Sequence, residues 1–118
     1  MSEIDQFVER YMQLWHETNA EARRRNIAEL FEEDGVQLLP EREYRGYDEL
    51  EERVSSAHEE FVVQGGFVFK RSGDVRGHHN AVTFSWDMVP AGGGEVAATG
   101  TIFLLLSDDG RIQFDYQF

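Results

Sequence analysis

The chain has 118 residues, of which 41% are apolar, and its 23 acidic residues outnumber 11 basic ones to give a formal net charge of −12. A chain of this length can bury one hydrophobic core, so we expect a single domain over residues 1–118. The negative charge would repel phosphate backbones and anionic headgroups over most of the surface, which argues against nucleic acid and membrane as partners.

The sequence shows no sign of membrane insertion or secretion. No apolar run reaches the roughly 18 residues that a bilayer-spanning helix needs, and "MSEIDQF" lacks the basic-then-apolar order of a signal peptide. The absence of cysteine excludes disulfides, thiolate metal ligands and cysteine nucleophiles. We therefore expect a soluble, cytoplasmic protein.

The N-terminal part of the sequence predicts two helices. Apolar residues three or four positions apart predict a first helix that starts near Ser2 and carries Tyr11 and Trp15 on its apolar face. The stretch "TNAEARRRNIAELFEEDG" predicts a second helix, with Thr18 as its N-cap and Gly35 at its end.

The pattern then changes from helix to sheet. "VQLLP" predicts a short strand and "EREYRG" an extended piece or a turn, and residues 47–63 predict a third helix with His58 on its apolar side. Four runs with period two follow, separated by turns that contain glycine or asparagine: "FVFKRSGDV", "AVTFSWDMV", "EVAATGTIFLLL" and "RIQFDYQF". They predict a four-stranded antiparallel meander in an α+β domain, with the helices over one face of a curved sheet.

Two of these strands indicate that both sheet faces are covered. Residues 102–106 are apolar without alternation, as in a strand buried on both sides. Because the helices can cover only one face, we expect a second copy of the chain on the other, in a homodimer. In the last strand, alternate side chains would point to opposite faces. The side chains that face the partner would be those of Ile112, Phe114, Tyr116 and Phe118, and those that face the helices would be Gln113, Asp115 and Gln117.

The order of these segments resembles a known superfamily. "VERYMQLW", "IAELFEEDGVQLLPER", "YRGYDEL" and the meander ending in "GRIQFDYQF" are similar to nuclear transport factor 2, ketosteroid isomerase and the SnoaL-like polyketide cyclases. The resemblance implies a cone: a strongly bent antiparallel sheet wrapped round the N-terminal helices, with an apolar pocket and frequent dimerisation. It specifies function weakly, because the superfamily includes isomerases, epoxide hydrolases, cyclases, dehydratases and binding domains.

The residues of ketosteroid isomerases carry over only in part. Tyr11 corresponds to their oxyanion-hole tyrosine, which makes it a candidate donor to a ligand oxygen. Leu39 stands where that family has its proton-shuttling carboxylate, and Ile102 or Thr101 stands at the place of the second acid. We therefore do not expect steroid isomerisation, since leucine cannot move a proton between carbons.

The last strand is similar to that of limonene-epoxide-hydrolase-like and SnoaL-like members, which direct an aspartate into the pocket. In "FDYQF", Asp115 and Tyr116 match the family pattern, whereas Phe114 and Phe118 replace an arginine and a final acid. "FSWDM" also lacks the pair of an arginine and an aspartate two positions apart that those hydrolases carry on a neighbouring strand. The resemblance thus implies an inward Asp115 without the full epoxide-hydrolase machinery.

The candidate catalytic residues are Asp115 as base or acid, His58 as its partner and Tyr11 as donor, although each is also a plausible core residue. An imidazole beside a carboxylate in an apolar cavity can exchange protons near neutral pH, and burial should raise the pKa of Asp115. No cofactor is expected and no metal, since the adjacent histidines of "GHHN" diverge in a tight turn. The expected ligand-binding residues are Trp15, Trp86, Phe84, Ile102, Leu104, Gln113 and Gln117.

The sequence alone leaves three functions open. The first is a cofactor-independent acid–base enzyme, whether isomerase, cyclase, dehydratase or hydrolase, that acts on a small apolar organic molecule. The second is a domain that binds such a ligand without transforming it. The third is a dimeric scaffold domain whose pocket has no present role.

Overall fold

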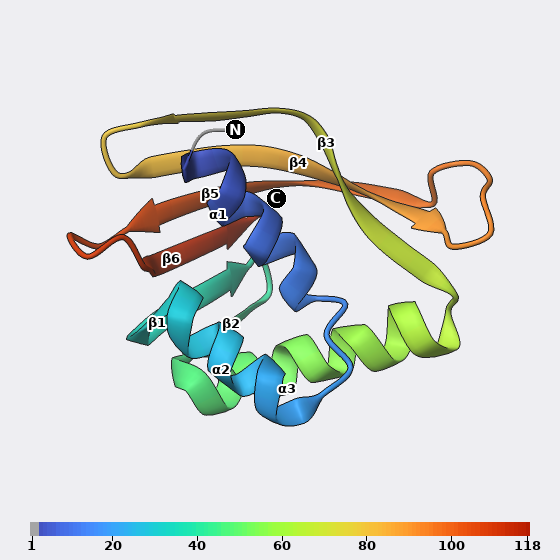
Figure 1. The fold of residues 1–118 in the computed structure, drawn as a ribbon, viewed down its shortest axis with the longest axis horizontal. Helices are drawn as coiled ribbons and strands as arrows, with labels where there is room; N and C mark the ends of the chain where they lie inside the picture. Colours follow the sequence, from blue (N-terminus) through green and yellow to red (C-terminus); the bar gives the residue numbers. More distant parts are fainter. Residues whose placement is uncertain (1–2) are drawn as a thin grey trace.

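The structure is a computed structural model that describes residues 3–118 (Figure 1), so the predicted cap Ser2 lies outside the described residues. The helices are α1 (Glu3–Leu14), α2 (Ala20–Leu30) and α3 (Gly46–Ala57), and a π-helical segment, η1 (His58–Gln64), continues α3. None of the helices in this part of the chain is long and apolar enough to cross a bilayer. The strands are β1 (Phe31–Leu39), β2 (Arg42–Arg45), β3 (Phe67–His78), β4 (Ala81–Pro90), β5 (Ala98–Leu106) and β6 (Ile112–Gln117).

The strands of residues 3–118 form one six-stranded sheet in the order β2-β1-β6-β5-β4-β3. The predicted meander is confirmed, because β3 pairs with β4, β4 with β5 and β5 with β6, all antiparallel. At its far edge β1 pairs in parallel with β6 and antiparallel with β2. The sheet is therefore mixed rather than wholly antiparallel, and the parallel pair sets Gln37 beside Asp115.

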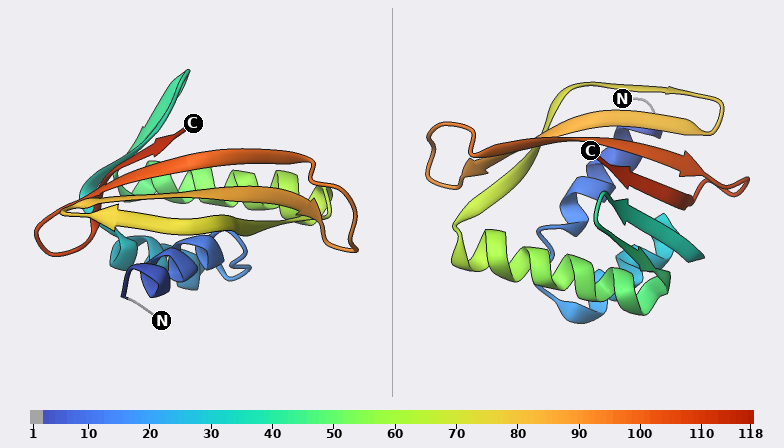
Figure 2. Two further views of the ribbon diagram at one scale, coloured as in Figure 1. Left: turned by 90° about the horizontal axis from the view of Figure 1, so that it is seen from above. Right: turned by 180° about the vertical axis from the view of Figure 1, so that it is seen from behind.

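The helices lie on one side of this bent sheet. α1 crosses the strands, with α2 and α3 below it in the view of Figure 1. The view from behind shows the opposite sheet face, over which no helix of residues 3–118 passes (Figure 2). Apolar side chains from both layers, among them Val8, Ile27, Leu50 and Leu104, form the core between them. This arrangement confirms the expected α+β cone.

The second helix differs from the prediction at both ends. Asn19 rather than Thr18 is its N-cap, since the Asn19 side chain accepts a backbone N–H three residues later at 2.9 Å. The helix ends at Leu30, and the chain runs directly into β1. Gly35 does not end a helix. It lies in β1 where the pairing with β6 is irregular, and a Cβ there would come within 2.8 Å of the Ile112 carbonyl oxygen.

A bulge in β6 alters the predicted alternation of the last strand. Leu105 pairs with Phe114 while Leu106 pairs with Ile112, so that Gln113 is an extra residue on β6. Ile112 consequently belongs to the core and not to the opposite face. Gln113 does not turn toward the helices: its amide donates to an exposed residue of β1 instead.

Beyond the bulge the alternation follows the prediction. Asp115 is 0% exposed, whereas Tyr116 is 36% and Phe118 is 77% exposed on the face without helices. On that face the Tyr116 ring packs against Phe103 and Phe114, with ring centroids 6.3 and 6.4 Å apart. The last strand therefore presents a carboxyl to the interior and aromatic rings to the outside.

Candidate functional site

A cavity of about 340 Å³ lies between α1, α3 and the sheet. Most of its wall is apolar and includes Trp15, Phe61, Phe69, Trp86 and Met88. The polar side chains in the wall are Tyr11, Arg53 and Gln117. A concave, mainly apolar space with a few polar groups is the usual construction of a small-molecule site.

A tyrosine and an aspartate form the polar centre of this site. The Tyr11 hydroxyl donates to Asp115 Oδ2 at 2.6 Å, a length typical of a hydrogen bond to a carboxylate. Tyr11 lines the cavity, whereas Asp115 does not. The carboxyl therefore reaches the cavity only through its hydrogen-bonded neighbours.

Aromatic packing holds Tyr11 in place on α1. Its ring centroid lies 5.7 Å from that of Phe84, 6.1 Å from Trp15 and 6.5 Å from Phe31. Contacts from three sides leave the ring little rotational freedom, since aromatic pairs at these separations are attractive. The hydroxyl position is therefore set by the core.

Two glutamines complete the hydrogen bonding. Gln37 Nε2 donates to Asp115 Oδ2 at 3.1 Å, and Gln117 Nε2 donates to Asp115 Oδ1. The same two amides lie 3.4 and 3.1 Å from the Tyr11 oxygen. The Tyr11 hydroxyl thus uses its donor and both of its acceptor positions inside the protein.

Burial controls the protonation of this group. It raises the pKa of Asp115 to about 6, although the hydrogen bonds from its three neighbours and the charge of Arg53 act in the opposite direction. Burial and the adjacent carboxyl raise the pKa of Tyr11 well above its usual range. Near neutral pH the Asp115 carboxyl therefore titrates, in the expected upward direction, while the tyrosine keeps its proton.

Arg53 is the cation of the cavity wall. Its Nε donates to Gln37 Oε1 at 3.0 Å. Its guanidinium lies over the rings of Trp15 and Tyr44, 5.6 Å from each centroid. Through Gln37 the cation is connected to the buried carboxyl of Asp115.

The residues expected to bind ligand divide into two sets. Phe84 and Leu104 are buried in the core, where Phe84 supports the Tyr11 ring, and neither lines the cavity. Gln113 lies outside the cavity wall because it is the extra residue of the β6 bulge. The cavity wall contains Trp15, Trp86, Ile102 and Gln117.

His58 is buried, but the structure does not bring it to Asp115. Neither a hydrogen bond to Asp115 nor a place in the cavity wall is found for it. Burial, followed by the positive charges of Arg23 and His16, lowers the pKa of His58, so that the imidazole is neutral near neutral pH. The carboxylate–imidazole pair expected from the sequence is not formed.

Two residues that the sequence analysis did not select, Gln37 and Arg53, belong to the site. Gln37 is a polar residue in the apolar run "VQLLP" and is only 1% exposed. Arg53 follows Leu50 by three positions and precedes Ala57 by four, which places it on the apolar side of α3. In both cases a polar residue at an apolar position of the pattern could have identified the residue as part of a site.

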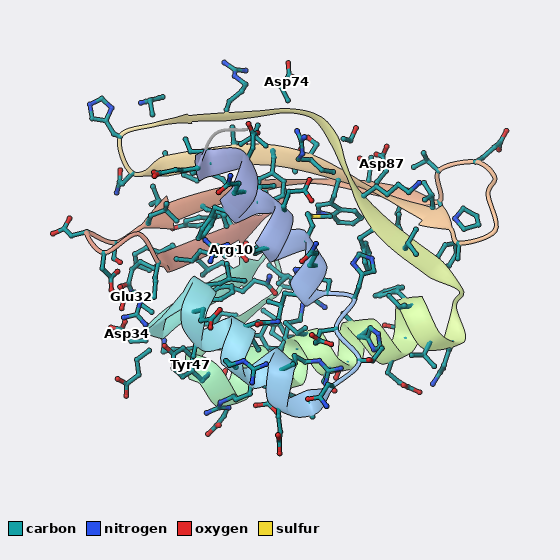
Figure 3. All side chains as sticks on the ribbon, in the orientation of Figure 1. Arg10, Glu32, Asp34, Tyr47, Asp74 and Asp87 are labelled. Carbon is teal, nitrogen blue, oxygen red and sulfur yellow. The ribbon has the colours of Figure 1, made fainter. Side chains whose placement is uncertain are left out.

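The described residues offer no metal centre: no three histidine, aspartate or glutamate side chains in them gather closely enough to hold an ion. Much of the negative charge lies at the periphery. Glu32 and Asp34 project from one end of the molecule, and Asp74 from the edge formed by β3 (Figure 3). The site itself offers one carboxyl, one phenol, two amides and one guanidinium.

The comparisons with known proteins bear on the same fold and site. Residues 8–114 match the model of the SnoaL-like domain, which is most of the chain. The chain belongs to the SnoaL-like family. This places the SnoaL-like domain in the superfamily of nuclear transport factor 2 that its segment order resembles. No protein of curated function matches it.

Solved structures share the fold of this SnoaL-like domain. A candidate isomerase of the SnoaL-like family from Agrobacterium tumefaciens is 25% identical with a TM-score of 0.88, and the match covers 100% of this chain and 97% of that one. A candidate polyketide cyclase from Sinorhizobium meliloti is 15% identical with a TM-score of 0.74 and complete coverage, 100% of each chain. A de novo designed protein with the fold of nuclear transport factor 2 is 18% identical, with a TM-score of 0.75 over 99% of this chain and 85% of that one.

Proposed function

We propose that this SnoaL-like domain binds a small, largely apolar organic molecule in its cavity and exchanges a proton with it through Tyr11 and Asp115. The observation that carries the proposal is the 2.6 Å hydrogen bond from Tyr11, which lines the cavity, to the fully buried Asp115. A pKa of about 6 lets Asp115 hold or release a proton near neutral pH, as a general acid or base requires.

Tyr11 relays the proton in this mechanism. When Asp115 is protonated, its O–H donates to the Tyr11 oxygen in place of the long 3.4 Å contact from Gln37, and the Tyr11 O–H becomes free to turn toward the ligand. The ligand then takes the Tyr11 proton while Asp115 passes its own proton to Tyr11, which leaves Asp115 ionised and Tyr11 unchanged. The reverse sequence removes a proton from the ligand. Because the pKa of Tyr11 is well above its usual range, the phenol conducts the proton and does not persist as tyrosinate.

The two glutamines support the ionised state of this relay. Gln37 and Gln117 donate to different oxygens of the Asp115 carboxylate and so stabilise its charge in a buried position. Proton exchange of this kind serves isomerisation, cyclisation and dehydration alike. The 25% identity to a candidate isomerase favours isomerisation among them.

Deuterium exchange tests the proposal without knowledge of the substrate. Small apolar ketones and enones are incubated with the protein in heavy water, and the loss of their α-proton signals is followed by proton NMR. We expect the wild-type protein to accelerate this exchange, and Tyr11→Phe and Asp115→Asn to return it to the buffer rate. Tyr116→Phe, on the outer face of the same strand, is the matched control and should behave as wild type. Equal rates for wild type and Tyr11→Phe would contradict the mechanism.

A carrier without chemistry is the second candidate. It is favoured by the apolar character of the wall and by the absence of Asp115 from it. A carrier would bind members of the same panel, with shifts in the signals of Trp15 and Trp86, but would leave their α-protons at the buffer rate of exchange.

We also propose that the molecule is a homodimer formed through the sheet face without helices. Phe103, Phe114 and Tyr116 form a continuous aromatic surface there, and Phe118, two residues after Tyr116, is 77% exposed. Exposed apolar surface of this kind is unusual on a soluble monomer. A second copy would cover it in a self-complementary contact.

A further inference from the structure

The guanidinium of Arg53 is bound by the protein along one edge only. Its Nε donates to Gln37, and its guanidinium carbon lies 5.6 Å from the ring centroids of both Trp15 and Tyr44. Neither Nη atom of Arg53 has an acceptor within residues 3–118. Both Nη atoms remain accessible, because the fully buried side-chain nitrogen without a partner in this part of the chain is Arg23 Nε and not an atom of Arg53. Four N–H groups of Arg53 are therefore held in place and unused.

Arg53 lines the cavity but forms no ion pair with a carboxylate within residues 3–118, unlike three other arginines of the chain. Arg24, Arg45 and Arg111 each form an ion pair with an acidic side chain at 3.2 Å or less. The chain carries 23 acidic residues, so carboxylates are abundant. Arg53 instead reaches Asp115 only through the amide of Gln37. An unpaired cation in a mainly apolar wall is most simply explained by an anion that arrives with the ligand.

The remaining groups of the wall limit what that anion can be. The donor groups of Tyr11 and Gln117 are already hydrogen-bonded to Asp115 and to each other, which leaves the Nη edge of Arg53 as the unused charged donor of the cavity wall. That edge matches the two oxygens of a carboxylate in a bidentate pair. A phosphate dianion would bring a second negative charge, for which the wall provides no further cation.

We infer that the ligand is a monocarboxylate with an apolar body, and that the Nη edge of Arg53 binds its carboxylate while the aromatic wall takes the remainder. This inference rests on the proposed function of the cavity as a small-molecule site and adds the chemical class of the ligand. Arg53 would then determine the preference for a carboxylate ligand. It bonds to the oxygen of the Gln37 amide, whereas Asp115 of the proton relay bonds to the nitrogen of the same amide.

Matched pairs of probes test this inference by calorimetry. Octanoate and phenylacetate are compared with octanamide and phenylacetamide, which have the same bodies without the charge, and phenyl phosphate represents the dianion. Wild-type protein should bind each carboxylate at least about tenfold more tightly than its amide, because hydrogen bonds to charged groups are the stronger ones. Arg53→Met should remove this preference, and continued binding of the amides by this variant would show that the cavity is still folded.

Two further variants make the comparison specific. Arg53→Lys keeps the positive charge but loses the two parallel Nη donors, and should retain only part of the preference for carboxylates. Arg42→Met removes an arginine that also lies over the Tyr44 ring, at 4.6 Å, but does not line the cavity, and it should keep the full preference.

The outcomes separate this inference from the proposed function. Carboxylate preference without deuterium exchange, in the ketone panel and in keto acids alike, would refute the proton relay and sustain the role of Arg53. Amides bound as tightly as carboxylates, a preference that survives Arg53→Met, or tighter binding of phenyl phosphate would overturn the inference alone. Failure of every probe to bind, together with an absence of exchange in the ketones and enones, would overturn both.

Discussion

At Asp115, burial and hydrogen bonding act in opposite directions on one carboxyl group. Removal from water favours the neutral acid, while Tyr11 and two glutamine amides favour the carboxylate. Burial has the larger effect, and the pKa rises to about 6. Asp115 therefore changes its charge near pH 6, where carboxyl groups with ordinary pKa values are already ionised.

The stability of the protein should depend on the charge of Asp115. Because its folded-state pKa of about 6 exceeds the ordinary 3.8, its contribution to the free energy of unfolding is complete below about pH 4 and is lost as the pH rises through about 6. The loss amounts to about 3 kcal/mol. Urea denaturation of wild type and Asp115→Asn should show the difference between their unfolding free energies falling by that amount over this interval. A difference that is constant with pH would contradict the raised pKa.

The sequence predicted the inward direction of Asp115 but not its partners. Period two placed Asp115 opposite Tyr116, and the β6 bulge left that relation intact because it lies before both residues. Gln37 could not be assigned to Asp115, since their contact depends on a parallel pairing between strands far apart in the chain. His58 was selected for its chemistry, and its position on the apolar side of the third helix does not specify which part of the interior it faces.

At the scale of the elements, the shape of the cavity depends on a contact between β4 and β5. Trp86, which lines the cavity, pairs with Gly100 across the two strands. The indole lies against Gly100, where an added Cβ would be 2.5 Å from the ring. Trp86 can occupy its present position because Gly100 has no side chain.

Gly100→Ala should displace the Trp86 indole and destabilise the fold by about 1–3 kcal/mol, the usual effect of overpacking. The shift of the Trp86 indole N–H signal and the urea midpoint measure the two effects. Gly92→Ala is the matched control, because a Cβ at Gly92 meets nothing within 4 Å. A Gly100→Ala protein with the indole signal and midpoint of wild type would show that this contact does not fix the ring.

The boundary between α2 and β1 shows how pairing overrides local preference. "LFEEDG" continues the helical pattern of the residues before it, and glycine commonly ends a helix, so the sequence predicted a helix as far as Gly35. In the fold, Phe31 already pairs with Ile112 of β6, and the chain is extended from there. Helix propensity is a weak preference that such tertiary contacts readily outweigh.

At the scale of the whole molecule, the helices leave one sheet face uncovered (Figure 2). The strands that contribute to this face, β5 and β6, also form the inner wall of the site through Ile102 and Gln117. A partner on the outer face would therefore stiffen the strands that hold the proton relay. Oligomeric state and activity are expected to be linked for this reason.

Phe114→Glu should prevent the proposed homodimer from forming and yield a monomer, because a buried charge without a partner opposes association. Light scattering at micromolar concentration measures the change. Val63→Glu is the matched control: Val63 is 58% exposed on η1, away from the sheet face, and this variant should remain dimeric. A monomeric wild-type protein at that concentration would contradict the proposed association.

The position of the tryptophans has a practical consequence. The chain contains two, Trp15 and Trp86, and both line the cavity. All of the indole emission of the protein therefore originates at the cavity wall, and one of the two emitters lies in contact with the guanidinium of Arg53. A molecule that enters the cavity replaces the surroundings of both emitters at once, so the protein carries its own optical reporter of occupancy, and large compound collections can be screened in plates without label or coupled assay.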